Sequence, residues 1–369
     1  MEGITKFIEC LAPVSVCNLE CEYCYLIQQN RRKMVNPKWE HSVEDTAKAL
    51  SKKRLGGMAY ISICGEGETL ISDDVVKLAY LLLENGHAVN ITTNGTVTNN
   101  IEKLAAFPQE LVKRLNISFS FHYLELEKKK LTDTFFSNIK KVKEAGASFV
   151  LQLNLCDSYI PHIEDIKRLS IENVGALPQI ALTRREKRKT NEFEIYTDLT
   201  EDEYIKYARE FNSPLFECTY ENFNKKRCEF CNAGAWSGVL NLKTGNLERC
   251  YGLDGVNIFD NVDKPIKMTA VGKHCPQRYC INSSHFMALG IIPEADIKSY
   301  GELRNRENAG WYNDTMKKLL YTKLGDVNPP LSNKEIDESE KSFKRITRRT
   351  KLKKLFPTLI KNLIKKIMR

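Results

Sequence analysis

The chain has 369 residues, 42% hydrophobic and 28% charged, as expected of a globular protein. This composition excludes a disordered chain, and no apolar run approaches the roughly 20 residues of a membrane-spanning helix. The length predicts two domains, or one large α/β domain with an appendage. No signal-peptide pattern opens the chain, so we expect a cytoplasmic protein whose twelve cysteines are reduced thiols, suited to metal or redox chemistry.

The net charge of +9 is concentrated at the C-terminal end. Twelve Lys or Arg residues and no acid follow Glu340, and removing them leaves residues 1–340 at −3. Residues 346–369 place apolar side chains at three- and four-residue intervals, which predicts a basic amphipathic helix kinked at Pro357. Such a helix favours peripheral contact with the inner membrane surface, with docking on the protein itself or on a partner as the alternative. Nucleic acid is disfavoured because the rest of the chain is acidic and carries no recognition motif.

Six short apolar or alternating runs recur through the first half of the chain, most of them separated by amphipathic segments of helical length. These runs are predicted strands, at residues 6–11, 59–64, 88–93, 115–121, 149–155 and 177–183. Helices are predicted at 43–55, 74–84 and 134–145, with Gly86 and Gly146 at the expected C-terminal caps. Strands that alternate with helices predict a parallel sheet, either open or curved into an incomplete barrel.

The second half changes character. Residues 183–191 are highly charged and are predicted to form a loop, and Thr200 is the predicted N-cap of a following helix. Cysteines and glycines then cluster over residues 218–285, and helices are expected again over 286–325. We therefore expect a barrel at 1–215, a small cysteine-rich domain with flanking helices at 216–325, and a linker with a basic tail at 326–369.

Three cysteines follow the first predicted strand at C-x3-C-x2-C spacing: Cys17, Cys21 and Cys24. Thiolates this close in a loop can converge on one metal centre. A four-iron cluster takes one ligand per iron, so three cysteines leave one iron open to a small molecule. A structural zinc ion, the alternative, needs four closed ligands, and no other His or Cys stands near enough in sequence to be an obvious fourth.

This spacing, with Tyr23 as the aromatic residue before the third cysteine, resembles the motif of the radical S-adenosylmethionine (radical SAM) enzymes. The resemblance covers about residues 5–200. A second segment, Cys64-Gly-Glu-Gly-Glu-Thr, resembles the Gly-Gly-Glu-Pro motif of that family, although Glu66 separates the glycines and Thr69 replaces the proline. The resemblance implies an α/β fold, a partial (β/α)6 TIM-like barrel, with its cofactors at the mouth formed by the C-terminal ends of the strands.

In this family a 4Fe-4S cluster would bind the three cysteines, and S-adenosyl-L-methionine would chelate the open iron. Glu68 would meet the amino group of that cofactor, and residues 92–96 resemble the family's Thr-Asn-Gly turn. Further contacts with the cofactor are expected from the motifs and from polar residues at strand ends, with an ordinary hydrogen-bonding role as the alternative for the latter: Tyr23, Gly65, Gly67, Asn94, Ser118, Ser120 and Asn154.

Other residues of the predicted strands carry weaker signals. His122 is expected either to contact substrate or to be an ordinary packed side chain. Cys10, Cys64 and Cys156 are expected to be buried, unreactive thiols.

A second group of cysteines lies beyond residue 218. Cys231 and Cys250 flank a predicted β-hairpin with its turn at 243–246, and their C-x13-G-x4-C pattern resembles the opening of the SPASM and Twitch auxiliary-cluster domains. Too few cysteines follow for two further clusters. The resemblance therefore implies one auxiliary iron–sulfur cluster with Cys231, Cys250, Cys275 and Cys280 as ligands, and Cys228 as a substitute for Cys231. A zinc site is the alternative.

The resemblance implies an enzyme that reductively cleaves S-adenosylmethionine to a 5′-deoxyadenosyl radical, which abstracts hydrogen from a substrate. That substrate would be a peptide or protein, a sugar or an envelope component. The auxiliary cluster would transfer electrons or bind substrate, and an electron donor such as flavodoxin or ferredoxin would supply the reducing electron. The alternative function is a non-catalytic zinc-binding protein whose basic tail binds a partner or nucleic acid.

Overall fold

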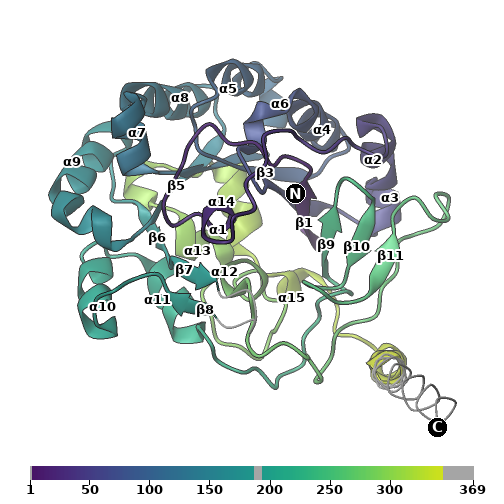
Figure 1. Ribbon diagram of the computed structural model, residues 1–369. Helices are drawn as coiled ribbons and strands as arrows, with labels where there is room; N and C mark the ends of the chain where they lie inside the picture. Colours follow the sequence, from purple (N-terminus) through teal and green to yellow (C-terminus); the bar gives the residue numbers. More distant parts are fainter. Residues whose placement is uncertain (1, 187–192, 344–369) are drawn as a thin grey trace, which may run out of the picture.

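The computed structural model describes residues 2–186 and 193–343 (Figure 1), so the predicted tail helix at 346–369 lies outside the described residues. A nine-stranded sheet with the order β11-β10-β9-β1-β2-β3-β4-β5-β6 forms its centre. The six strands of the first half pair in parallel, each with the next. They are β1 (Lys6–Ala12), β2 (Ala59–Gly65), β3 (Ala88–Thr93), β4 (Leu115–Ser120), β5 (Ser148–Asn154) and β6 (Gln179–Ala181).

These six strands confirm the predicted runs, and helices follow them on the outside of the curved sheet (Figure 1), as in a partial (β/α)6 barrel. Both faces of a parallel sheet are covered, so its strands are almost wholly buried. The helices of this part are α1 (Tyr25–Gln28), α2 (Val43–Ala49), α3 (Lys52–Leu55), α4 (Asp73–Glu84), α5 (Thr98–Ala105), α6 (Gln109–Val112), α7 (Tyr123–Lys129), α8 (Thr132–Glu144), α9 (Ile163–Val174), α10 (Glu201–Arg209) and α11 (Pro214–Asn222), with short 3-10 turns at η1 (Thr69–Ile71) and η2 (Asp157–His162).

Three local predictions were wrong. The helix predicted at 43–55 is interrupted after Ala49, and a second short helix starts at Lys52. Part of the loop predicted at 183–191 is a strand, because β7 (Arg184–Glu186) forms an antiparallel pair with β8 (Phe193–Ile195). Residues 287–299 contain no helix, since Gly290 adopts φ +83° and Pro293 follows it.

The second half of the chain extends the barrel sheet. β9 (Ser237–Asn241) pairs in parallel with β1, and β10 (Asn246–Glu248) turns back on it, which confirms the predicted hairpin. β11 (Gly255–Asn257) completes this end of the sheet. The cysteine-rich region is therefore joined to the barrel through the backbone of β1.

The opposite end of the barrel, where the parallel strands begin, is covered by α13 (Tyr300–Arg304), η3 (Glu307–Ala309), α14 (Asp314–Tyr321) and α15 (Leu324–Val327). The backbone N–H of Phe149, at the start of β5, donates to the carbonyl of Trp311 at 3.0 Å. The Trp311 indole N–H donates to the carbonyl of Val174 at 2.9 Å. Asn328 reaches the carbonyl of Thr5, just before β1, at 2.9 Å. The end opposite the strand C-termini is thus closed by protein.

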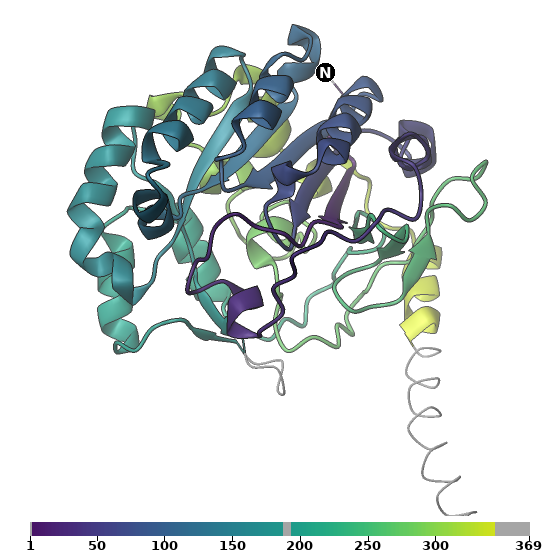
Figure 2. The same ribbon diagram turned by 45° about the horizontal axis from the view of Figure 1, so that its top comes forward.

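Residues 333–343 form a helix at the side of the molecule that carries β9 to β11 (Figure 2). A carboxylate oxygen of Glu340 lies 2.9 Å from Nε2 of His274, and the Phe343 ring stacks on the His274 ring. No helix in the described part of the chain has both the length and the apolar composition needed to cross a bilayer.

The loop after β1 packs tightly on the segment that follows β2. The backbone N–H groups of Gly67 and Glu68 donate to the carbonyls of Val14 and Val16, each at 2.8 Å. A Cβ atom on Gly67 would lie 2.1 Å from the carbonyl oxygen of Val16. Only glycine fits at residue 67, because the obstacle is backbone and cannot rotate away.

A buried histidine ties the start of β2 to the helices beside it. His87 is wholly buried; its Nδ1 accepts from the backbone N–H of Ala59 at 3.0 Å, and its Nε2–H donates to the carbonyl of Leu50 at 2.8 Å. Burial lowers the pKa of His87 from 6.5 to about 4, so the folded protein holds this ring neutral.

We expect the protein to lose stability as the pH falls from 6.5 toward 4. The unfolded chain protonates His87 in this range while the folded chain does not, so protons favour unfolding, by about 3 kcal/mol once the pH has fallen below both pKa values. Urea unfolding at pH 7.5 and pH 5 measures the effect. His87→Gln keeps an acceptor and a donor and should show a smaller difference between the two pH values; an unchanged difference would contradict the assignment.

Gly67→Ala should destabilise the protein by about 2 kcal/mol or more, because the loop carrying Cys17 must move away from the new methyl group. Thermal unfolding measures the loss. Gly325→Ala is the matched control, since a Cβ there meets only ordinary contacts, the nearest at 3.6 Å. Equal melting temperatures for the two variants would show that residues 14–16 do not constrain residue 67.

Candidate active site

The C-terminal ends of the parallel strands surround a cavity of about 600 Å³. The loop after β1 brings all three cysteines of the first group to its wall. This loop is held from several sides. The Asn36 side chain accepts from the backbone N–H groups of Ser15 and Val16 at 2.9 Å, and Arg32 donates to the carbonyl of Cys17 at 2.8 Å. Each cysteine therefore enters the cavity from a fixed backbone.

The three thiols lie within electrostatic reach of one another. Burial, and then the charges of Cys17 and Cys24, raise the pKa of Cys21 far above its usual range. Burial also raises the pKa of Cys17, to which the charges of Glu68 and Cys24 add. Three thiolates can share this space only if positive charge joins them, and bound metal supplies such charge as the ligands lose their protons. The donor set therefore fits an iron–sulfur cluster with three cysteine ligands.

Glu68 is the buried carboxylate of this wall. It is 2% exposed, and its oxygens accept from the Thr93 hydroxyl at 2.5 Å and from the backbone N–H groups of Asn94 at 2.6 Å and Leu70 at 2.9 Å. Burial raises its pKa, while these three hydrogen bonds lower it. Glu68 thus connects the end of β2 to the turn after β3, and its carboxylate still borders the cavity.

The turn after β3 lies against the cysteine loop. The Asn94 amide donates to the Asn18 side chain at 2.8 Å and lies 3.9 Å from the Cys17 sulfur. Asn18 in turn donates to the Thr96 hydroxyl at 2.8 Å. The predicted Thr-Asn-Gly turn is thereby placed at the first cysteine, which its distance along the sequence does not reveal.

Tyr23 stands between Cys21 and Cys24 in the sequence, and its side chain contacts residues that follow β4 and β5. Its hydroxyl lies 2.6 Å from Nδ1 of His122 and 3.2 Å from the Tyr159 hydroxyl. Burial lowers the pKa of His122 to about 4, so its ring is neutral near pH 7. A neutral ring that accepts from Tyr23 at Nδ1 carries its proton on Nε2.

Of the remaining residues predicted to contact the cofactor, some border the cavity and one does not. Ser120 and Asn154 border the cavity at the ends of β4 and β5. Ser118 does not border it, because its hydroxyl donates to the Asn90 side chain at 2.9 Å inside the sheet. Cys10 and Cys156 are buried, as predicted. The prediction of a buried thiol was wrong for Cys64, which is half-buried and borders the cavity since β2 ends there.

Four cysteines of the second group also lie within electrostatic reach of one another. Burial, and then the charges of Cys250, Cys231 and Cys275, raise the pKa of Cys280 well above its usual range. Burial raises the pKa of Cys231 and of Cys250 to about 12. Cys228 differs, since it is exposed. The structure groups the four cysteines expected to bind the auxiliary cluster and leaves the predicted substitute at the surface.

Backbone and side-chain contacts join the loops of this second group. The backbone N–H of Cys231 donates to the carbonyl of Gly272 at 3.2 Å, and Gln277 donates to the carbonyl of Tyr251 at 2.8 Å. The Lys226 ammonium donates to the carbonyl of Cys275 at 2.7 Å. In the described residues, no three His, Cys, Asp or Glu side chains are arranged to hold a single metal ion.

The cavity also contains residues that the sequence analysis missed. Glu9 projects into it from β1, and Tyr251 and Asn282 reach it from the second cysteine region. Glu9 had a signal that was overlooked: it is an acid inside an otherwise apolar strand apart from its first residue, Lys-Phe-Ile-Glu-Cys-Leu-Ala. For Tyr251 and Asn282 the sequence carries no comparable signal, because loops far along the chain bring them there.

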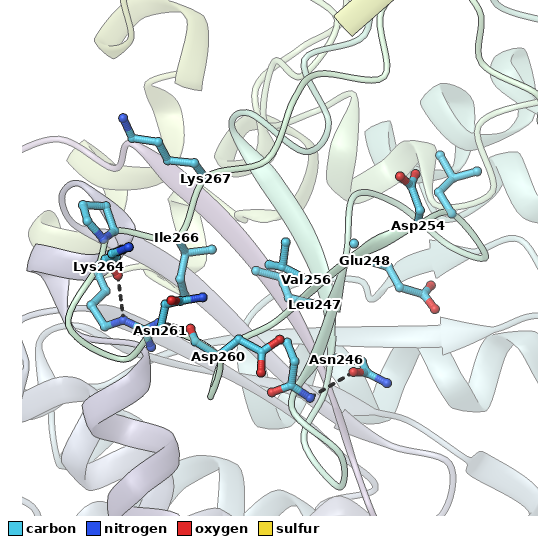
Figure 3. A pocket seen from close by; sticks show the side chains of 15 residues that line it. Asn246, Leu247, Glu248, Asp254, Val256, Asp260, Asn261, Lys264, Ile266 and Lys267 are labelled. Atoms are coloured by element: carbon cyan, nitrogen blue, oxygen red, sulfur yellow. Dashed lines mark hydrogen bonds between the residues drawn. The ribbon is translucent and has the colours of Figure 1, made fainter. Parts of the chain in front are cut away.

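A second cavity, of about 780 Å³, lies against β10 and β11 and the loop at 260–267 (Figure 3). Its wall is made of amide, charged and aliphatic side chains and includes no cysteine. It shares no residue with the cavity at the strand ends. This second cavity is therefore separate from the cavity that the cysteines of the first loop border.

Comparison with known proteins gives one family and several distant structures. Residues 11–157 match the Radical SAM superfamily. The fold is similar to that of SuiB from Streptococcus suis, with a TM-score of 0.46 and 17% identity over 71% of this chain and 65% of SuiB. Native anSMEcpe with bound AdoMet gives a TM-score of 0.47 and 16% identity over 69% of this chain and 79% of that one. BtrN in complex with AdoMet and 2-DOIA gives 0.37 and 14% over 71% and 82%. No curated protein sequence matches.

The chain thus spans about two-thirds of the length of SuiB. The segment matched by the family contains the three cysteines of the first loop, Glu68 and Asn94, which the structure brings to one cavity wall. The similarity to the radical SAM superfamily therefore rests on residues 11–157, the segment that brings these residues to the cavity wall.

Proposed function

We propose that this radical SAM enzyme carries two iron–sulfur clusters and abstracts hydrogen from a polar substrate held between them. One observation carries the proposal: a single cavity is bordered by the three cysteines of the first loop and by residues directly beside the second cysteine group. Tyr251 follows Cys250, and Asn282 stands two residues after Cys280. A molecule in this cavity would be within reach of both groups.

At the first site, Cys17, Cys21 and Cys24 would hold the catalytic cluster, and the wall beside them would hold S-adenosylmethionine. Once bound, the cluster and this cofactor supply a 5′-deoxyadenosyl radical that takes a hydrogen atom from the substrate. The protein's part is to orient the reactants and exclude water. Glu68 offers a buried acceptor for an amino group, and Asn94 and the Tyr23–His122 pair fix the walls on either side.

At the second site, Cys231, Cys250, Cys275 and Cys280 would hold the auxiliary cluster. Four thiols complete the ligand set of a four-iron cluster, so this cluster would transfer electrons and would leave substrate binding to the cavity. A flavodoxin or ferredoxin would supply the reducing electron to the first cluster.

The cavity wall indicates the chemistry of the substrate. Its inward polar groups include a carboxylate from Glu9, a guanidinium from Arg184 and amides from Gln152 and Asn154. A volume of about 600 Å³ is within the range of small-molecule sites and must also admit S-adenosylmethionine. A peptide side chain, a sugar or a piece of an envelope component offers the hydroxyl and amine groups that such a wall would bind.

The first test is made without oxygen on protein reconstituted with iron and sulfide, then supplied with S-adenosylmethionine and dithionite. We expect about eight irons per chain, four for each cluster, and formation of 5′-deoxyadenosine. Cys21→Ala should keep about four irons and form no 5′-deoxyadenosine. Zinc in place of iron, with a colourless protein, would overturn the proposal; equal product from wild type and Cys21→Ala would overturn the assignment of the first site.

The second test compares two cysteines that are close in sequence but differently placed. Cys231→Ser should lose the iron of the second site, about half the total, because Cys231 is grouped with the other three thiols. Cys228→Ser should keep the full iron content, since Cys228 is exposed. Iron per chain and the visible absorption of the cluster measure both. The opposite result would exchange the roles of these two residues.

A further inference from the structure

Glu9 faces the cavity from within a strand of the sheet. β1 lies between β2 and β9, and Glu9 pairs with Ser62 on one side and Val239 on the other. The residue is 7% exposed. No ion pair within 4 Å is formed by it in the described part of the chain, although the charges of Arg184 and Arg304 act on it from farther away. Burial raises the pKa of Glu9, while hydrogen bonds from Tyr251 and Asn282 and the charges of the two arginines lower it, so its ionised form depends on this support.

That support comes from the second cysteine region. The Asn282 amide donates to both oxygens of Glu9, at 3.1 and 2.9 Å, and the Tyr251 hydroxyl also hydrogen-bonds to the carboxylate. The same Asn282 amide lies 3.2 Å from the Tyr251 hydroxyl, so the three side chains form one cluster. Tyr251 and Asn282 stand on the two loops that present Cys250 and Cys280. Glu9 is thus bound directly to the loops that carry two of the expected cluster ligands.

The charge of Glu9 also lies close to this group, because its carboxylate hydrogen-bonds to Asn282, two residues after Cys280. The net charge around an iron–sulfur cluster and the hydrogen bonds near its sulfurs are among the main determinants of its reduction potential. A negative charge nearby disfavours the added electron. The surroundings are largely buried, so solvent screens this effect only weakly.

We propose that Glu9 is a positioning residue that sets the reduction potential of the auxiliary cluster and couples it to the occupancy of the cavity. Its carboxylate holds the Cys250 and Cys280 loops through Tyr251 and Asn282, and its charge lowers the potential of the cluster that they bind. Because Glu9 also borders the cavity, a substrate hydroxyl or amine that donates to it partly neutralises this charge and favours reduction of the cluster. This inference rests on the proposed second cluster.

The test is a redox titration of the full chain in the Cys21→Ala background, where only the second cluster contributes a signal. Glu9→Gln keeps the shape and an acceptor for Asn282 but removes the charge. It should raise the equilibrium constant for one-electron reduction about tenfold, a positive shift of about 59 mV. Glu9→Asp keeps the charge and should change the constant by less than about threefold. Glu172→Gln, an exposed carboxylate paired with Arg168 on α9, is the matched control and should have no effect.

Each outcome decides the point. A Glu9→Gln constant close to that of the parent would overturn the proposal, and so would equal shifts in Glu9→Gln and Glu9→Asp, which would indicate geometry in place of charge. Failure of both variants to take up the second cluster, with normal uptake by Glu172→Gln, would assign Glu9 a purely structural role. Absence of a second cluster in the Cys21→Ala parent would refute the two-cluster function itself, before any change at Glu9.

Discussion

The pairing of β1 with two strands from opposite halves of the chain is the constraint on which the rest of the structure depends. On one side β1 hydrogen-bonds to β2, whose end carries Gly67 and Glu68; on the other it hydrogen-bonds to β9, whose hairpin leads to Cys250. The loop directly after β1 carries the first three cysteines. One strand therefore sets the distance between both thiol groups and places a cavity between them.

The two buried carboxylates that border this cavity, Glu68 and Glu9, are held by hydrogen bonds from different parts of the chain. Glu68 is held by the Thr93 hydroxyl and by backbone N–H groups of the barrel, so its support comes from the first half of the chain. Glu9 is held by side chains of the second cysteine region, so its surroundings change if those loops move. The first is fixed before the second cysteine region is in place. The second connects the substrate space to loops that lie outside the barrel.

Much of the barrel could be predicted because its signals are local. Alternating apolar runs located six strands, and the capping box at Thr200 located the start of α10. The Cys17 spacing and the Glu68 segment predicted residues that the structure brings to one cavity, since the family motif is short and continuous in sequence. The β7–β8 pairing and the break after Ala49 were missed because they depend on contacts that propensity does not encode.

The part of the site that the sequence did not reveal is the part assembled over long distances. Ser118 is polar and stands on a strand, as Ser120 does, yet only the latter reaches the cavity because the side chains of a strand differ in their surroundings along its length. Tyr251 and Asn282 meet Glu9 across separations of more than 240 residues. Such meetings follow from the tertiary fold, and a short motif cannot contain them.

The β1–β9 ladder also has a consequence for synthesis on the ribosome. β1 ends at Ala12 and its partner begins at Ser237, so one edge of β1 stays unpaired while the residues between them are made. At typical rates of translation this takes about 10 to 45 seconds. Throughout that time the nascent barrel exposes an open strand next to three free thiols. Early folding thus produces an edge prone to aggregation, which only the arrival of the second cysteine region can cover.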